Sequence, residues 1–586
     1  MENQTFVLEN LDYVAFIGYF ILLSFIGYWF GRKKSASSAD YFLAGRTLPW
    51  YVVGSSYIAS NISTEHFIGL IGAAVIYGIS VATGEWSTVI AFTFLIWLFI
   101  PYLLTSKVYT TPEFLEKRFS KTIRRIFAIV SILANIFAFM GPVIYGGSLI
   151  LTEFFNISPV NACIIIGITT GGWAVWGGLK SVAFMDVLTI LIMIFGGLTV
   201  TFLGLAYLGE GEGIIKGFSV MVDVNTGNVD WAKIWISENV PNILKGAEKG
   251  DAYSRLSVIQ PLNHYSNPWT HWVFSFFYIG LWYTVVNQTM VQKIFAAKDM
   301  YHARGGMVLA SFLKLLLPVI VVIPGLIFFA MKPDFLTSGD WASQSDAANK
   351  TYIQMISILV PTFLKGVLLA ALFGAIQSTV SSVLNSTSTM FTIDIYQEIY
   401  KKDGSSDHYV KTGKVVGAIF LAISIVFAII LATVTKVNLF ILIQALYVFI
   451  APPFSALFLL GMLWKRVGGK DALVTVIAGF AMAGFLKFLE FGVLEDSTSE
   501  FANFIKPFAN QGLITWVFSM LVCIISSLIT PNPDENQVSR DLTFNINGSA
   551  LKQGLGTKWY NKIFTWWMLN VIILIVIILI FSVVLK

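Results

Sequence analysis

Long apolar stretches, separated by short polar connections, occupy most of this chain of 586 residues. A helix that crosses the hydrocarbon core of a bilayer needs about 20 mostly apolar residues. Roughly fourteen stretches meet this requirement, so the pattern predicts an all-α polytopic membrane protein with about 14 transmembrane helices. The predicted spans cover residues 12–31, 50–76, 81–104, 123–154, 158–176, 184–209, 270–293, 309–331, 352–395, 413–435, 437–463, 471–492, 513–530 and 562–585.

Basic residues recur in every second connection between these spans. Lys117 and Arg125 belong to a basic connection, whereas Asp340 and Glu495 belong to acidic connections on the opposite side. Lysine and arginine in short loops remain on the cytoplasmic side. The alternation therefore predicts a multi-pass protein of the cell membrane, plasma or inner, with both its N-terminus and its C-terminus outside.

The composition agrees with a chain that lies mainly in lipid. Hydrophobic residues make up 56% of the chain and charged residues 12%, whereas a soluble domain is about 25% charged. The net charge of +5 comes with no basic stripe, so we expect no nucleic-acid partner. The chain carries neither a glycine-rich phosphate-binding loop nor a hydrolase motif, so we expect no ATP-driven pump, no enzyme and no organic cofactor.

Polar residues interrupt the second span between Ser55 and His66. A continuous helix would place Asn61, Glu65 and His66 near the middle of the membrane, where polar groups are costly. An unwound segment around Ser60–Thr64 would instead free backbone carbonyls, which are tolerated where they line a cavity or hold an ion. The alternative is a polar seam of small residues between two helices, which explains the serines but not Glu65 beside His66.

The ninth predicted span carries hydroxyl groups at helical spacing, including Ser378, Ser381 and Ser382. Neutral hydroxyl and carbonyl oxygens are ligands that suit a hard cation such as sodium. Packing of small residues against a neighbouring helix is again the alternative. If the unwound part of the second span faces this helix, the two segments together predict a sodium site.

Single polar residues lie in several other apolar stretches, namely Glu85, Asp186, Lys314 and Gln444. Each of them alone is compatible with an interfacial position. Taken together with the aromatic pair Trp282-Tyr283, they predict a hydrogen-bonding cavity with aromatic walls. Such a cavity suits a sugar, because polar groups bind its hydroxyls and aromatic faces cover its C–H surface.

Gly280 interrupts the seventh span, five spans after the interruption of the second. Two broken helices in corresponding positions are typical of transporters built from inverted repeats. We therefore expect an N-terminal extra helix with an inner loop, a first five-helix repeat, an extracellular segment, a second five-helix repeat, and C-terminal peripheral helices with an inner linker. These parts cover residues 1–49, 50–209, 210–269, 270–463 and 464–586, with the linker at 531–561.

Several motifs resemble the sodium/solute symporter family, and most closely its sodium/glucose and sodium/galactose cotransporter branch. They include the stretches at 40–46, 59–62, 111–119 and 458–466. The resemblance extends over nearly the whole chain. It implies a LeuT-like core of two five-helix inverted repeats with discontinuous helices, which works by alternating access.

The resemblance also implies roles for individual residues. The sodium ligands would be the backbone oxygens of Ala59, Ile62 and Ala375 and the hydroxyls of Ser378 and Thr379. The groups that hydrogen-bond the sugar would be Asn61, His66, Glu85, Lys314 and Gln444, and Tyr283 would close the sugar from the inside beside Trp282. Asp186, Ser381 and Ser382 match a second sodium site of members that couple two ions.

The expected function is secondary active transport, in which sodium drives the symport of a glucose-like or galactose-like monosaccharide. Gly280 and Thr284 depart from residues common in the sugar branch, so myo-inositol and sialic acid remain alternative solutes. The acidic Glu85 in the predicted cavity argues against an anion. We expect sodium as the coupling ion, the lipid bilayer as surroundings, and a monomer that suffices for transport.

Overall fold

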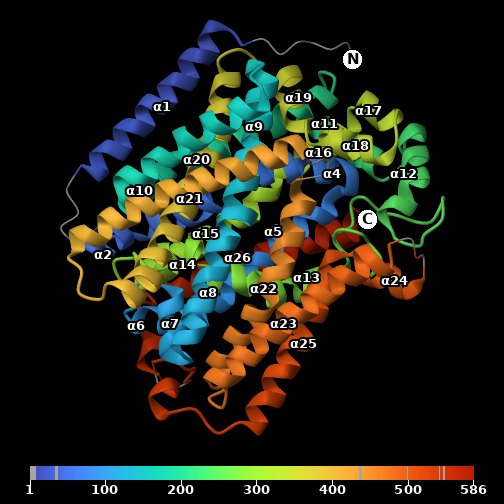
Figure 1. The fold of residues 1–586 in the computed structure, drawn as a ribbon. Coiled ribbons are helices and arrows are strands. Elements are labelled where there is room, and N and C mark those ends of the chain that lie inside the picture. Colours follow the sequence, from blue (N-terminus) through green and yellow to red (C-terminus); the bar gives the residue numbers. More distant parts are fainter. Residues whose placement is uncertain are drawn as a thin grey trace.

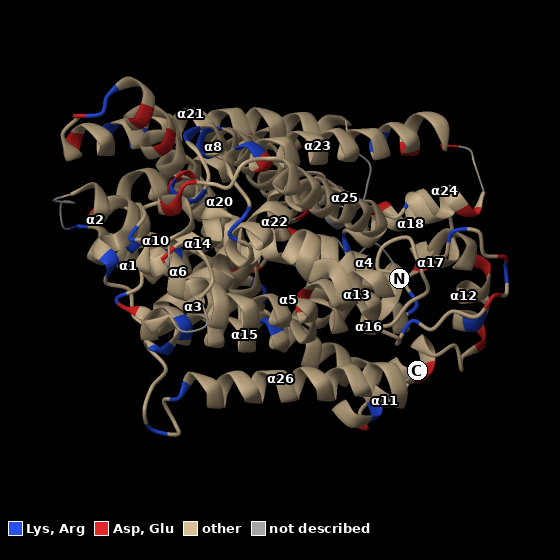
Figure 2. Cartoon of the chain, turned by 90° about the horizontal axis from the view of Figure 1, so that it is seen from below, with Lys and Arg blue, Asp and Glu red and all other residues tan. Residues whose placement is uncertain are grey.

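The computed structural model describes residues 8–32, 37–434, 439–495, 497, 499–539, 541–545 and 548–585. This part of the chain folds into a helical bundle without β-strands (Figure 1), and two isolated bridges join Leu48 to Ala297 and Leu244 to His264. Figure 2 shows that lysine, arginine, aspartate and glutamate gather at two opposite ends of the bundle, while the long helices between them carry few charges. This distribution is the one expected of a bundle that crosses a bilayer.

The first half of the bundle contains the predicted spans two to six. Its helices are α3 (Trp50–Asn61), η2 (Glu65–Leu70), α4 (Ile71–Tyr77), η3 (Gly78–Ala82), α5 (Thr83–Phe94), η4 (Leu95–Phe99), α6 (Ile100–Thr105), α7 (Thr111–Arg118), α8 (Lys121–Ala134), η5 (Asn135–Met140), α9 (Gly141–Phe155) and α10 (Pro159–Leu208). The helix α1 (Asn10–Gly31) precedes them, followed by the short α2 (Ser38–Leu43) and η1 (Ala44–Arg46).

The second half contains the predicted spans seven to eleven. Its helices are α13 (Trp269–Ser275), η6 (Phe276–Gly280), η7 (Trp282–Val286), α14 (Gln288–Phe295), α15 (Met300–Val321), α16 (Ile323–Ala330), α17 (Asp334–Thr337), α18 (Trp341–Ala348), α19 (Thr351–Leu359), α20 (Leu364–Met390), η8 (Phe391–Tyr400), α21 (Ser406–Val434) and α22 (Leu439–Leu463). The predicted start of the eleventh span at residue 437 lies outside the described residues.

The C-terminal part adds peripheral helices, which leave many large apolar side chains on the outer surface. They are α23 (Gly469–Phe488), η9 (Leu489–Val493), α24 (Glu500–Ile505), α25 (Phe508–Ile529), η10 (Glu535–Val538), η11 (Ser549–Lys552), α26 (Ile563–Leu579) and η12 (Ile580–Val584). In Figure 2, α26 runs along one edge of the bundle. Exposed apolar surface of this kind is stable when lipid covers it.

Eleven helices in the described residues are long and apolar enough to cross a membrane. Two of them contain two spans each, because the backbone turns at Gly78 (φ 74°) and at Gly178 (φ 64°). Both residues adopt a positive φ that side chains disfavour, and a Cβ on Gly78 would lie 2.2 Å from the Arg255 carbonyl oxygen. With the interrupted stretch α13–α14 added, the described chain accommodates the fourteen predicted spans.

The sequence predicted a single span over residues 352–395, but the structure divides this apolar run into two helices. The helix α19 ends at Leu359, Val360 is extended (ψ 125°), and α20 begins at Leu364. Pro361 explains the break, because proline disfavours the helical conformation of the residue before it and has no amide proton. The ninth span therefore corresponds to α20 with the π-helical extension η8.

The helix α20 forms the centre of the bundle, and every residue from Leu368 to Met390 is buried. It packs against α10, α21 and α3, and Figure 1 shows α10, α20 and α21 side by side. Small side chains permit this close packing of helices in lipid. The central position also means that hydroxyl groups on α20 face other helices and not the bilayer.

The predicted extracellular segment forms α11 (Ile214–Asn225), α12 (Asp230–Ile243) and an irregular stretch that covers the end of α4. Arg255 in this stretch is fully buried, and its guanidinium donates to the carbonyls of Ala74, Val75 and Ile76 at 2.8–3.3 Å. These carbonyls lie in the last turn of α4, where Ala74 also accepts the Gly78 amide but Val75 and Ile76 have no helical amide to accept from. Arg255 therefore joins this segment to α4, the second half of the broken second span.

A second contact holds the same corner. His264 Nδ1 accepts hydrogen bonds from the backbone amides of Ser266 and Asn267, so the ring proton is on Nε2. This Nε2–H faces the Tyr253 hydroxyl at 3.2 Å, and the Tyr253 hydroxyl donates to the Tyr77 carbonyl at 2.6 Å. Burial lowers the pKa of His264 to about 3. The imidazole is therefore neutral at physiological pH, and this contact does not depend on charge.

We expect Arg255→Met to lower the midpoint of thermal inactivation in detergent, with a destabilisation of about 3 kcal/mol, because buried carbonyls lose a charged donor. Lys216→Met, on the exposed face of α11, is the matched control and should leave the midpoint unchanged. Equal midpoints for the two variants would show that Arg255 does not hold α4.

Candidate sodium and solute sites

The second span is broken where the sequence predicted an unwound segment. The helix α3 ends at Asn61, Ile62 is extended (φ −79°, ψ 119°), and helical structure resumes around Glu65. The amide of Ser63 donates to His66 Nδ1 at 3.3 Å instead of continuing the helix. The carbonyls at the end of α3 are thus left without helical amides, and they are available to another partner.

The hydroxyl-rich helix α20 faces this break. Thr379 Oγ1 lies 3.2 Å from the carbonyl oxygens of both Ser60 and Ile62, and Ser382 Oγ lies 2.7 Å from Ser60 Oγ. Ser378 Oγ is buried and faces the Asp186 carboxylate. Neutral oxygens from two helices therefore converge on one small volume.

The residues expected to bind sodium lie around this volume. Ile62 and Thr379 are within hydrogen-bond distance of each other, and Ala59 belongs to the last turn of α3. Ala375 precedes Thr379 by one turn of α20, so its carbonyl points toward the same level of the helix. All four residues and Ser378 are at most 3% exposed.

The second predicted sodium set is only partly assembled. The Asp186 carboxylate on α10 accepts a hydrogen bond from the Ser56 hydroxyl at 2.5 Å. The Ser60 hydroxyl donates to the Ser56 carbonyl and lies 2.7 Å from the Ser382 hydroxyl. Ser381 donates instead to the Thr170 carbonyl at 3.0 Å. Asp186 and Ser382 therefore lie on one polar path beside the break, while the Ser381 hydroxyl is engaged with α10.

A cavity adjoins the break and opens between α5, α13, α15 and α22. Its empty space is about 610 Å³, including the part open to solvent. Six of the predicted solute-binding residues line it: Asn61, His66, Glu85, Tyr283, Lys314 and Gln444. Three of them form one charged group; the sequence left open whether Lys314 pairs with Glu85, pairs with Asn61 or binds the solute.

The Glu85 carboxylate is paired on both sides. One oxygen accepts from the Lys314 ammonium, and the other lies 3.3 Å from His66 Nε2. Because His66 Nδ1 accepts the Ser63 amide, the proton of the neutral ring is on Nε2 and points at Glu85. Lys314 thus compensates the charge of Glu85, and Glu85 alone does not exclude an anion, contrary to the argument from sequence.

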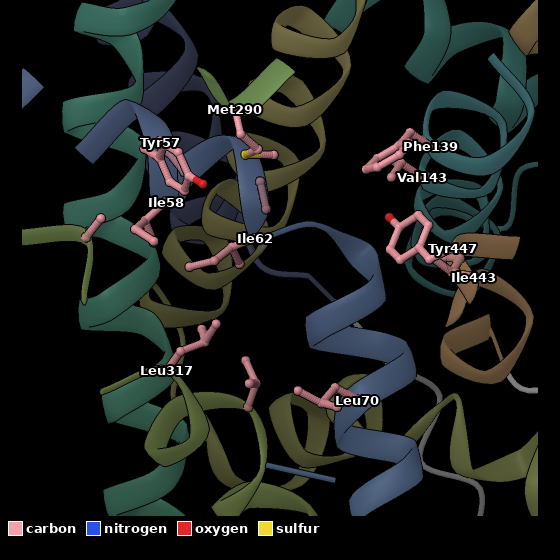
Figure 3. Close-up of a cluster of buried hydrophobic side chains, with 14 of the residues drawn as sticks. Tyr57, Ile58, Ile62, Leu70, Phe139, Val143, Met290, Leu317, Ile443 and Tyr447 are labelled. Atoms are coloured by element: carbon pink, nitrogen blue, oxygen red, sulfur yellow. The ribbon is translucent and has the colours of Figure 1, made fainter. Parts of the chain in front are cut away.

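Aromatic rings form one wall of the cavity. Trp282 was predicted to belong to this wall, but it is not among the lining residues. Neighbouring residues on a helix point in different directions, so Tyr283 faces the cavity and Trp282 is buried behind it. Tyr447, which the sequence analysis missed, lines the cavity and packs on Phe139 with ring centroids 4.7 Å apart. Figure 3 shows Tyr447 beside Phe139, and Ile62 at the break of the second span.

The sequence suggested a break of the seventh span at Gly280, but the structure shows none there. Helical turns continue through η6 and η7, and the first extended residue is Asn287 (φ −64°, ψ 117°), whose Oδ1 accepts the Thr289 amide at 2.9 Å. An asparagine can cap a new helix in this way, a signal that the sequence does contain. Gly280 instead lines the cavity, where the missing side chain enlarges the space.

Comparison with known proteins agrees with this architecture. The family model described as "Sodium:solute symporter family" matches residues 41–479. The chain belongs to this family. The symporter is 32% identical over 546 residues to the sodium/glucose cotransporter of Vibrio parahaemolyticus, with 92% of this chain and 93% of the relative covered. It is 31% identical to the human sodium/myo-inositol cotransporter, with 94% and 78% covered.

Among solved structures, the symporter is similar to a Na⁺-coupled sialic acid symporter in a substrate-bound outward-open state. The TM-score is 0.70 at 20% identity, with 89% of this chain and 99% of the other covered. This likeness shows the fold, which is LeuT-like. The chain is therefore a multi-pass membrane transporter that couples solute movement to sodium, as its relatives are.

Proposed function

We propose that this symporter carries a neutral monosaccharide, glucose-like or galactose-like, together with sodium by alternating access. The observation that supports this most is the shared segment at the broken second span. Ile62 faces Thr379 on the ion side, while Asn61 and His66 line the solute cavity. Two ligands that order the same segment bind more tightly together than apart, which is the requirement for coupling.

In this proposal sodium is held by the carbonyls of Ala59, Ile62 and Ala375 and the hydroxyls of Ser378 and Thr379. A second ion at Asp186 and Ser382 would add to the driving force. One charge that crosses about 100 mV supplies about 2.3 kcal/mol, and a tenfold solute gradient costs about 1.4 kcal/mol. One sodium ion per cycle thus suffices to accumulate the solute more than tenfold inside, and two ions per cycle would roughly square this accumulation ratio.

The solute is assigned by the chemistry of the cavity. Hydrogen-bonding groups from Asn61, Lys314 and Gln444 line the same cavity as the rings of Tyr283 and Tyr447, a combination that suits a ring with hydroxyls on its edge and C–H groups on its faces. The similarity to sodium/myo-inositol cotransporters favours a cyclic polyol as the second candidate. We further propose that a monomer suffices and that both termini lie outside.

The test is uptake of labelled glucose, galactose, myo-inositol and sialate into proteoliposomes. We expect uptake of at least one hexose, or of myo-inositol, that requires an inward sodium gradient and increases with a negative internal potential. Uptake at the same rate without sodium would refute the coupling. Sodium-driven uptake of sialate with no hexose or polyol would refute the solute assignment.

A further inference from the structure

Glu65 is a second carboxylate in the solute cavity, and it follows directly on the break in the second span. Its side chain lines the cavity and is 8% exposed. Its amide donates to Ser63 Oγ at 3.2 Å. Within the described ranges, however, no donor lies within hydrogen-bond distance of the carboxylate, and no lysine, arginine or histidine forms an ion pair with it.

The other charges of the cavity do not compensate Glu65. The Lys314 ammonium is already in contact with Glu85, and the proton on His66 Nε2 belongs to a neutral ring that also faces Glu85. His271 contacts the Tyr278 hydroxyl at 2.5 Å through Nδ1. The lining therefore holds two carboxyl groups and one ammonium. A buried carboxylate without a cation is costly, so a cationic ligand beside Glu65 would stabilise its ionised form.

The surroundings of Glu65 also favour a cation. The rings of Tyr283 and Tyr447 line the same cavity as Glu65, with their centroids 5.9 Å apart. Aromatic faces attract positively charged groups. A positive group placed between Glu65 and these rings would interact with both, whereas an anion there would find no free cation, because Lys314 is in contact with Glu85.

We propose that Glu65 sets the charge selectivity of the cavity: it favours sugars or polyols that carry a protonated amine, and it excludes those that carry a carboxylate. The proposal rests on the proposed function, because it takes a hydroxylated solute as given. Glu85 does not exclude anions, because Lys314 compensates its charge. In this proposal Glu65 excludes them instead.

The test compares three probes that share one ring: glucose, glucosamine and glucuronate. Their dissociation constants are measured by calorimetry on the full-length protein in detergent with saturating sodium, at a pH at which the amine is protonated and the acid ionised. For the unaltered chain we expect glucosamine to bind at least about tenfold more tightly than glucuronate. Glu65→Gln keeps the shape of the side chain, and the ratio of these two constants should fall to near one.

Glu212→Gln is the matched control, because it removes the same charge from an exposed position outside the cavity, and the ratio should remain that of the unaltered chain. Glucuronate that binds the unaltered chain as tightly as glucosamine would overturn the proposal, as would a ratio that survives Glu65→Gln. If glucose drives sodium-coupled uptake but the ratio is one, only the role of Glu65 is wrong. If no probe binds, the sugar assignment is wrong, and the role of Glu65 with it.

Discussion

Replacing Ser378 and Thr379 with alanine will abolish the sodium dependence of solute uptake. Thr379 Oγ1 lies 3.2 Å from two carbonyl oxygens of the broken helix, and the buried Ser378 hydroxyl beside it faces the Asp186 carboxylate. A sodium ion bound there would lose two of its oxygen ligands. Each single variant should raise the sodium concentration for half-maximal uptake at least about tenfold, which corresponds to about 1.4 kcal/mol.

The measurement is the initial rate of solute uptake into proteoliposomes as a function of external sodium. Thr387→Ala is the matched control, because Thr387 lies on the same buried helix but bonds Asn135 at 2.8 Å. This variant should keep the sodium dependence of the unaltered chain. If all three single variants show the same sodium dependence, the ion does not bind between α20 and the broken second span.

Lys314→Met will abolish solute binding and destabilise the fold. The substitution leaves the Glu85 carboxylate buried with only the neutral His66 beside it, in a cavity that already contains Glu65. Removal of one partner of a buried ion pair costs about 3–5 kcal/mol. We therefore expect a large fall in the midpoint of thermal inactivation, together with loss of solute-dependent sodium uptake.

The double variant Lys314→Met with Glu85→Gln separates these two effects. A neutral amide next to a methionine is far less costly than an unpaired carboxylate, so most of the stability should return. Solute binding should remain lost, because both polar groups that face the solute are altered. A double variant no more stable than Lys314→Met would show that the cost arises from packing and not from the charge of Glu85.

The sequence contained enough information for the main features of the fold. About 20 apolar residues per span, with polar connections between them, are properties of consecutive residues and do not depend on distant parts of the chain. The run of small polar residues before His66 likewise indicated a break, since a continuous helix would carry those groups into lipid. The hydroxyls of α20 were visible for the same reason.

Other predictions were wrong because two neighbouring residues could each have given the observed feature, and the sequence did not show which of them does. Gly280 looked like the break in the seventh span, yet a glycine inside a lipid-embedded helix is tolerated when its neighbours pack closely. The capping residue Asn287 determines the break instead. Trp282 and Tyr283 were both assigned to the cavity wall, but adjacent helical side chains diverge, and the rotation of the helix determines which of them faces inward.

What the sequence by itself determined is therefore the set of spans, the unwound segment in the second, and the oxygen-rich helix of the ninth. Only the tertiary structure decided that Lys314 neutralises Glu85, that Glu65 has no ion-pair partner among the described residues, and that Tyr447 packs beside Tyr283. The physical reason is distance along the chain. Hydropathy and helix breaking depend on neighbouring residues, whereas the charge of a cavity depends on which side chains from remote helices come within a few ångströms of one another.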